Sequence, residues 1–134
     1  MAVRRSRQRW FWFALSVLVA LILFLVAVSN AAYEATSPSW LSWHVLLRKG
    51  YSLAAFGLVG LLFAHTARAF DRPSGAVPVG LMVLSYSALI ELGQRLISGA
   101  HESLEQQGFD VACGLIGGIL GALAARAQKS APRD

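Results

Sequence analysis

Residues 77–97, VPVGLMVLSYSALIELGQRLI, form an apolar stretch that ends in a short polar run, Glu91-Leu92-Gly93-Gln94-Arg95. A helix of this length, at about 1.5 Å per residue, crosses the roughly 30 Å of hydrocarbon in a bilayer. A carboxylate, an amide and a guanidinium are costly there, so such residues normally face the interior of a helix bundle. The stretch predicts a transmembrane helix that carries a candidate site near one end.

Three further stretches, residues 10–29, 48–66 and 110–125, are also apolar, and the last is short and glycine-rich. The chain is 56% hydrophobic and 14% charged, whereas soluble domains are about one quarter charged. The first stretch follows a basic segment, as a secretory signal does. Its apolar run is longer than the roughly 7–15 residues of a signal core, which favours an uncleaved helix. We predict an all-α membrane protein, a bundle of four transmembrane helices.

The remaining segments are a basic N-terminus, three loops and a polar tail: residues 1–9, 30–47, 67–76, 98–109 and 126–134. If both termini are cytoplasmic, all but three of the 12 Lys and Arg residues lie on the cytoplasmic side. The exceptions are Arg48, Lys49 and Arg95. This excess agrees with the positive-inside rule, so we predict cytoplasmic N- and C-termini.

This topology gathers polar residues at the outer ends of three spans. A basic pair opens the second span, the Glu91–Arg95 run ends the third, and Asp110 begins the fourth. Together they predict one polar cluster that faces outward and binds a ligand. Its members are Arg48, Lys49, Glu91, Gln94, Arg95 and Asp110.

Helix periodicity indicates which faces of the third and fourth spans meet. Residues three or four apart share a helix face. The third span therefore has one stripe that consists of Gly80, Leu84, Ser87, Glu91 and either Gln94 or Arg95. On the fourth span, Asp110 shares a face with small residues that form overlapping GxxxG patterns, a common but unspecific packing signal. The two stripes are predicted to pack together. The packing glycines are Gly114, Gly117, Gly118 and Gly121.

Each charged residue of the cluster also has a structural interpretation. Glu91 can pair with Arg48, Lys49 or Arg95, which would neutralise a charge that is costly in lipid. Arg95 can extend to the interface. Asp110, at the start of a helix, can cap exposed amides. The partner of Arg48 and Lys49 can be Glu91, Asp110 or a lipid headgroup. The sequence leaves these alternatives open.

Three short blocks in this region follow a recognisable order: Leu47-Arg48-Lys49-Gly50 with Gly60, then Glu91-Leu92-Gly93-Gln94, then Asp110-Val111 with Gly117 and Gly121. Over residues 45–125 this order resembles the VanZ-like family of small bacterial membrane proteins. The family is named for a member linked to resistance to the glycopeptide antibiotic teicoplanin. The resemblance implies a multi-pass protein of the bacterial cytoplasmic (inner) membrane.

The chain departs from the family pattern at several positions. Ser52 and Phe56 stand where many relatives have His and Tyr, and Gly114 stands where they have Asn. Residues 98–100, Ser-Gly-Ala, replace a common Pro-Gly-Arg. The family brings no settled biochemical activity, and a proton-transfer role that needs the His or Tyr does not carry over. Whether the protein is an enzyme stays uncertain, and the balance leans against it.

Three functional hypotheses remain open. In the favoured one, the outer polar pocket binds a cell-envelope component: a lipid-linked glycan, a phospholipid headgroup or a glycopeptide-like ligand, with a link to antibiotic resistance or envelope biogenesis. In the second, an intramembrane enzyme acts on a lipid-linked substrate with Glu91 as general base. In the third, the glycine face of the fourth span docks an envelope protein complex. Membrane lipids are expected partners, and an oligomer is compatible with so small a bundle.

Other classes of function are disfavoured. The net charge is +5, but no basic face interleaved with aromatic residues indicates a nucleic-acid partner. The three histidines, His44, His65 and His101, are scattered, so no metal site is expected. No nucleotide-binding loop or nucleophile motif occurs, and no cofactor is predicted. The single cysteine, Cys113, cannot form an internal disulfide.

Overall fold

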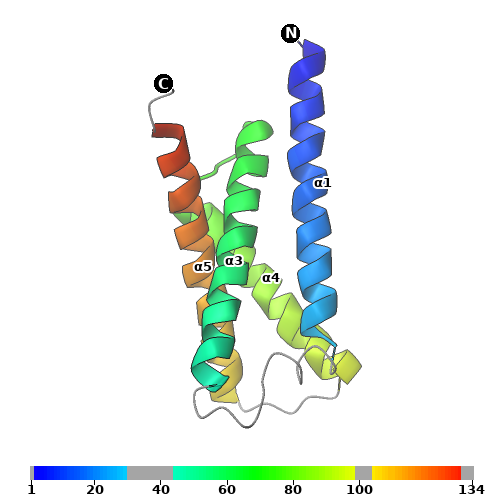
Figure 1. Cartoon of the computed structure of the whole chain (residues 1–134), viewed down its shortest axis with the longest axis vertical. Coiled ribbons are helices and arrows are strands. Elements are labelled where there is room, and N and C mark those ends of the chain that lie inside the picture. Colours follow the sequence, from blue (N-terminus) through cyan, green and yellow to red (C-terminus); the bar gives the residue numbers. More distant parts are fainter. Residues whose placement is uncertain (1, 30–43, 99–103, 131–134) are drawn as a thin grey trace.

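The computed structural model describes residues 2–29, 44–98 and 104–130, with side-chain positions for 6–29, 49–97 and 108–130. It contains four long helices, α1 (Ala2–Ala27), α3 (His44–Ala69), α4 (Ala76–Gly93) and α5 (Leu104–Ser130), and a short π-helix, η1 (Gln94–Ser98), that continues α4 (Figure 1). No strand occurs in these ranges. Four helical segments, with α4 and η1 counted as one, are long and apolar enough to cross a membrane. The predicted all-helical class with four candidate spans is confirmed.

The helices extend beyond the apolar stretches from which they were predicted. α3 begins at His44 rather than at residue 48, and α5 covers Leu104–Ser130 rather than residues 110–125. Backbone hydrogen bonds do not depend on side-chain hydropathy, so a helix can extend beyond the apolar run that is long enough to cross a membrane. Residues 30–43 and 99–103 of the predicted loops lie outside the described part of the chain.

Successive helices run in opposite directions, so the N-terminus of α1 and the C-terminus of α5 lie at the same end of the molecule (Figure 1). We call this the terminal end; it also holds the turn between α3 and α4. The opposite end, where α3 and α5 begin and α4 finishes, is called the Lys49 end. α3 and α5 lie side by side, while α4 crosses obliquely and approaches α1 at the Lys49 end (Figure 1).

Small residues set the contact between α3 and α5. A Cβ atom at Gly60 would lie 2.7 Å from the Cα of Gly118, and one at Gly117 would lie 2.6 Å from the Cβ of Phe56. A Cβ at Gly121 would overlap backbone atoms of α3 at Gly57, Gly60 and Leu61. The two helix backbones therefore touch, which is how membrane helices gain van der Waals contact without a hydrophobic driving force.

The opposite side of the glycine face contacts α4. A Cβ at Gly118 would lie 2.8 Å from the Cβ of Val83, and one at Gly114 would lie 2.5 Å from the Cβ of Ser87. A Cβ at Gly80 would lie 2.9 Å from a side-chain carbon of Ile119. All four glycines predicted to pack, Gly114, Gly117, Gly118 and Gly121, are buried between α5 and its two neighbours.

α1 is more peripheral than the other helices, because only 6% of its candidate span is buried. Polar contacts fix its position along the bundle. The hydroxyls of Ser16 and Thr66 lie 2.7 Å apart, and the Tyr86 hydroxyl donates to the carbonyl oxygen of Ala20 at 2.6 Å. Such hydrogen bonds between membrane helices contribute about 0.6 kcal/mol each on average.

The turn between α3 and α4 closes α3 with a Schellman motif. The amide of Arg72 donates to the carbonyl of Ala67 at 2.7 Å, and the amide of Asp71 donates to that of Arg68 at 3.2 Å. Asp71 has a positive φ of 55°, a conformation that Asp tolerates better than most residues. The Asp71 carboxylate accepts a 2.7 Å hydrogen bond from Arg9 of α1. The turn thus links α1 to the end of α3.

The glycine contacts predict a large difference between two alanine substitutions. Gly121→Ala places a methyl group against backbone atoms that cannot rotate away, and we expect a loss of about 1–3 kcal/mol of unfolding free energy. Gly50→Ala is the matched control, because nothing lies within 4 Å of a Cβ at Gly50. It should be neutral or stabilising by up to about 1 kcal/mol. Unfolding in mixed micelles measures both, and equal stabilities would contradict the packing.

Candidate functional site

An ion pair between α3 and α5 lies at the Lys49 end. The ammonium of Lys49 contacts Oδ1 of Asp110, and the same ammonium lies 4.6 Å from the centroid of the Phe109 ring. The Asp110 side chain is 11% exposed and that of Lys49 is 22% exposed. An aromatic face attracts a cation, so Phe109 and Asp110 hold Lys49 from two adjacent positions on α5.

Asp110 is held in turn by α4. The hydroxyl of Ser87 donates to the backbone carbonyl oxygen of Asp110 at 3.2 Å. Ser87 is almost completely buried, and its Cβ occupies the space that a side chain at Gly114 would need. The predicted stripes on the third and fourth spans therefore meet here, with Ser87 and Asp110 in contact.

Neither charge of the pair lies at a helix terminus. α3 begins at His44, so Lys49 is beyond its first turn, and α5 begins at Leu104, so Asp110 is beyond the first turn of that helix. The helix dipole and the unpaired amides act within the first turn only. The interpretation of Asp110 as a helix cap is therefore wrong, because the chain becomes helical earlier than its apolar pattern indicates.

The residues of the Glu91–Arg95 run contact two different parts of the bundle. Glu91 is partly buried and lies one turn beyond Ser87 on the face of α4 that approaches α5. Gly93 and Gln94 lie against α1 instead. A Cβ at Gly93 would lie 2.7 Å from the ring of Phe24, and the Gln94 amide nitrogen donates to the carbonyl oxygen of Ala27 at 2.9 Å.

The Gln94 contact satisfies the end of α1. Ala27 is the last residue of that helix, and the final carbonyls of a helix have no partner within it. Gln94 is also the first residue of the π-helix η1, so the wider helical turn begins at the residue that contacts α1. Gln94 therefore anchors α1 to α4, a role that the spacing Glu-x-x-Gln did not indicate.

The other predicted site residues are placed less centrally. Arg95 lies in η1 and is exposed, and the side chain of Arg48 lies outside the described residues. Cys113 is buried one turn beyond Asp110. Within the described ranges, no group of three His, Cys, Asp or Glu side chains is placed to hold a metal ion.

The arrangement favours recognition over bond-breaking chemistry. A Lys ammonium has three N–H donors, and in this site it is partly exposed and oriented by a carboxylate. Such a group suits contact with a phosphate or a carboxylate of a ligand. The Ser87 hydroxyl, which donates to the backbone carbonyl oxygen of Asp110, is buried, so it is not presented to a substrate.

Comparisons with known proteins do not extend this picture: no family model, no curated protein and no solved structure matches the chain. The class that the fold and the site define is therefore an all-helical chain with four candidate membrane spans and a part-buried ion pair at one end.

A double-mutant cycle tests the ion pair. Removing one partner takes a charge-assisted contact away from a part-buried charge, so Lys49→Met and Asp110→Leu should each lower the unfolding free energy by about 1.5–3 kcal/mol. The double variant should be more stable than the sum of the two losses predicts. The exposed pair Arg9–Asp71 is the matched control, with an expected coupling under about 1 kcal/mol. Additive losses at Lys49 and Asp110 would contradict the site.

Proposed function

We propose that this chain is a non-enzymatic, multi-pass protein of the bacterial cytoplasmic membrane, similar to the VanZ-like family, whose Lys49 end binds an anionic cell-envelope component at the outer face. The observation that carries the proposal is the part-buried Lys49–Asp110 pair, which joins two helices. Glu91, on the face of α4 that approaches α5, is also partly buried. Ionisable residues within a membrane bundle are retained mainly where they serve a function.

The distribution of cations supports the proposed orientation. At the terminal end the described cations outnumber the one described anion, Asp71; they are Arg7, Arg9, Arg68, Arg72, Arg126 and Lys129. The Lys49 end has a more balanced set, in which Lys49 and Arg95 accompany Glu91 and Asp110. By the positive-inside rule, the terminal end then faces the cytoplasm and the Lys49 end faces outward.

The favoured ligand is a lipid-linked glycan that carries a pyrophosphate group. In this proposal the ammonium of Lys49, with Arg95 and Arg48, contacts the phosphate oxygens, since cations and phosphates form strong charge-assisted hydrogen bonds. Asp110 and Glu91 hold the cations in position. The polyprenyl chain lies in the membrane beside α4 and η1, where Leu92, Leu96 and Ile97 are exposed. A phospholipid headgroup or a glycopeptide would meet the same charges.

A binding measurement on oriented membranes tests this function. A short-chain polyprenyl pyrophosphate is titrated into right-side-out and into inverted vesicles that contain the protein. We expect binding only from the outer side. For Glu91→Gln we expect a dissociation constant about tenfold higher, because one charge-assisted interaction is weakened. Asp71→Asn is the matched control: it makes the same change at the terminal end and should leave the constant unchanged.

Two results would overturn the proposal. Equal binding to inverted vesicles would contradict the orientation. Unchanged affinity of Glu91→Gln, or its loss from the membrane as an unfolded protein, would assign Glu91 a structural role only.

A further inference from the structure

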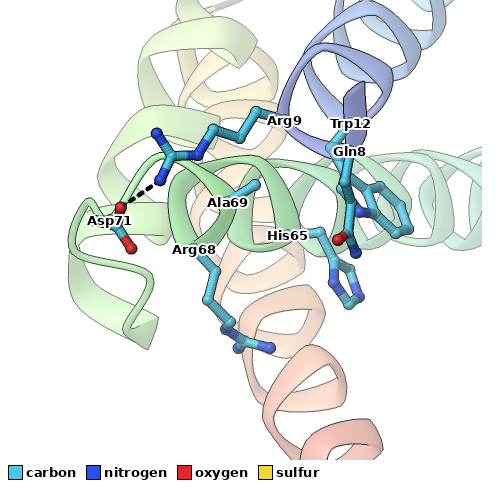
Figure 2. Close-up of a pocket in the computed structure, with 7 residues that line it drawn as sticks. All are labelled: Gln8, Arg9, Trp12, His65, Arg68, Ala69 and Asp71. Atoms are coloured by element: carbon cyan, nitrogen blue, oxygen red, sulfur yellow. Dashed lines mark hydrogen bonds and ion pairs between the residues drawn. The ribbon is translucent and has the colours of Figure 1, made fainter. Parts of the chain in front are cut away.

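A polar pocket of about 380 Å³ lies at the terminal end, between α1 and α3. Figure 2 shows its lining: Gln8, Arg9 and Trp12 come from α1, while His65 and Arg68 come from α3. Asp71, in the turn after α3, lies beside Arg9. The pocket is at the small end of the range for ligand sites, about 300–1,000 Å³, and has the size for a headgroup rather than for a whole lipid.

The pocket has a flat aromatic wall. The ring of His65 stacks on that of Trp12, with 4.5 Å between centroids and 12° between planes. On α5, Oε1 of Gln128 lies 3.1 Å from Nε2 of His65 and fixes the orientation of the imidazole. Three helices therefore define this wall before any ligand binds, which reduces the ordering that binding requires.

The charge of the pocket favours an anion. Arg9 and Arg68 line it together with one carboxylate, that of Asp71. Arg68 uses Nη1 to donate to the carbonyl of Ala125 at 3.1 Å, and a guanidinium has five N–H donors in all. The contact with Ala125 therefore positions the guanidinium and occupies one donor nitrogen, while the other N–H groups can donate to an oxyanion.

The surroundings indicate that the anion belongs to a lipid. Trp10, Phe11 and Phe13 are exposed on the same turns of α1, as in the aromatic belt that marks a membrane interface. Two turns further into the span, on the faces that carry Trp12 and His65, lie Val19 and Leu58. A polar pocket at the interface followed by an apolar surface matches the order of headgroup and acyl chain in a phospholipid.

We propose that this pocket binds the phosphate headgroup of an anionic membrane phospholipid, with Arg68 and Arg9 as the anion contacts and Gln8 as a further hydrogen-bond donor. The stacked rings of Trp12 and His65 line the side of the headgroup. The site is separate from the Lys49 end, so it does not depend on the ligand proposed there. A lipid held here would bridge α1 and α3, which the Ser16–Thr66 contact also joins further along the bundle.

The test compares two glutamate substitutions on α1. Gln8→Glu adds a negative charge inside the pocket, and Ser6→Glu adds the same charge two residues away at an exposed position outside it. Binding of phosphatidylglycerol and of phosphatidylcholine to the purified full-length protein is measured by native mass spectrometry. We expect wild-type protein to prefer phosphatidylglycerol, and Gln8→Glu to weaken its binding by about fivefold or more, with Ser6→Glu within about twofold.

Arg68→Gln is a second variant and should weaken phosphatidylglycerol binding to a similar extent, whereas Arg126→Gln, outside the pocket, should not. Because both residues changed on α1 are exposed, a failure to fold is not expected to hide the result. Equal effects of Gln8→Glu and Ser6→Glu would mean diffuse surface charge and would overturn the proposal. So would equal binding of the two lipids, or displacement of phosphatidylglycerol by millimolar inorganic phosphate, which would assign the site to a soluble anion.

Discussion

Backbone contact along one face of α5 is the constraint on which the rest of the structure depends. Gly117 and Gly121 touch α3, and Gly114 and Gly118 touch α4. A side chain at any of these positions would separate the helices. Asp110 lies on the same face, one turn before Gly114, so the contact that packs the bundle also directs its carboxylate to Lys49. The same face of α5 therefore provides both the helix packing and the Asp110 carboxylate. Because α3 and α4 cover the glycines of this face, it is not presented to a partner protein.

The two ends of the bundle use charge in different ways. At the Lys49 end a part-buried pair joins α3 to α5, and its partial desolvation makes the loss of one partner more costly than at the surface. At the terminal end Arg9 and Asp71 form an exposed pair of small energetic value, beside a pocket with excess positive charge. α1 bridges these ends with little burial, so contacts such as Gln94 with Ala27 determine where it lies.

Much of the fold could be predicted from the sequence, because hydrophobic length identifies spans and small residues at helical spacing identify a packing face. The meeting of Ser87 with Asp110 followed from the same periodicity. The contact of Gln94 with α1 could not be predicted, since α1 has no polar pattern that specifies a face. The sequence did not decide among several partners for Lys49. It also did not predict the terminal pocket, because Trp12 and His65 are far apart in sequence. Only the shared membrane level of their helix ends could have indicated that the two rings meet.

The most direct test of the account is a proton contact between two glycines. Selective glycine labelling of the 12 glycines gives a simple spectrum of the protein in lipid nanodiscs. If α3 and α5 touch as described, an α-proton of Gly60 must show a nuclear Overhauser cross-peak to an α-proton of Gly118. A Gly60 signal with cross-peaks to lipid only, and none to Gly118, would contradict the close approach and with it the position assigned to Asp110.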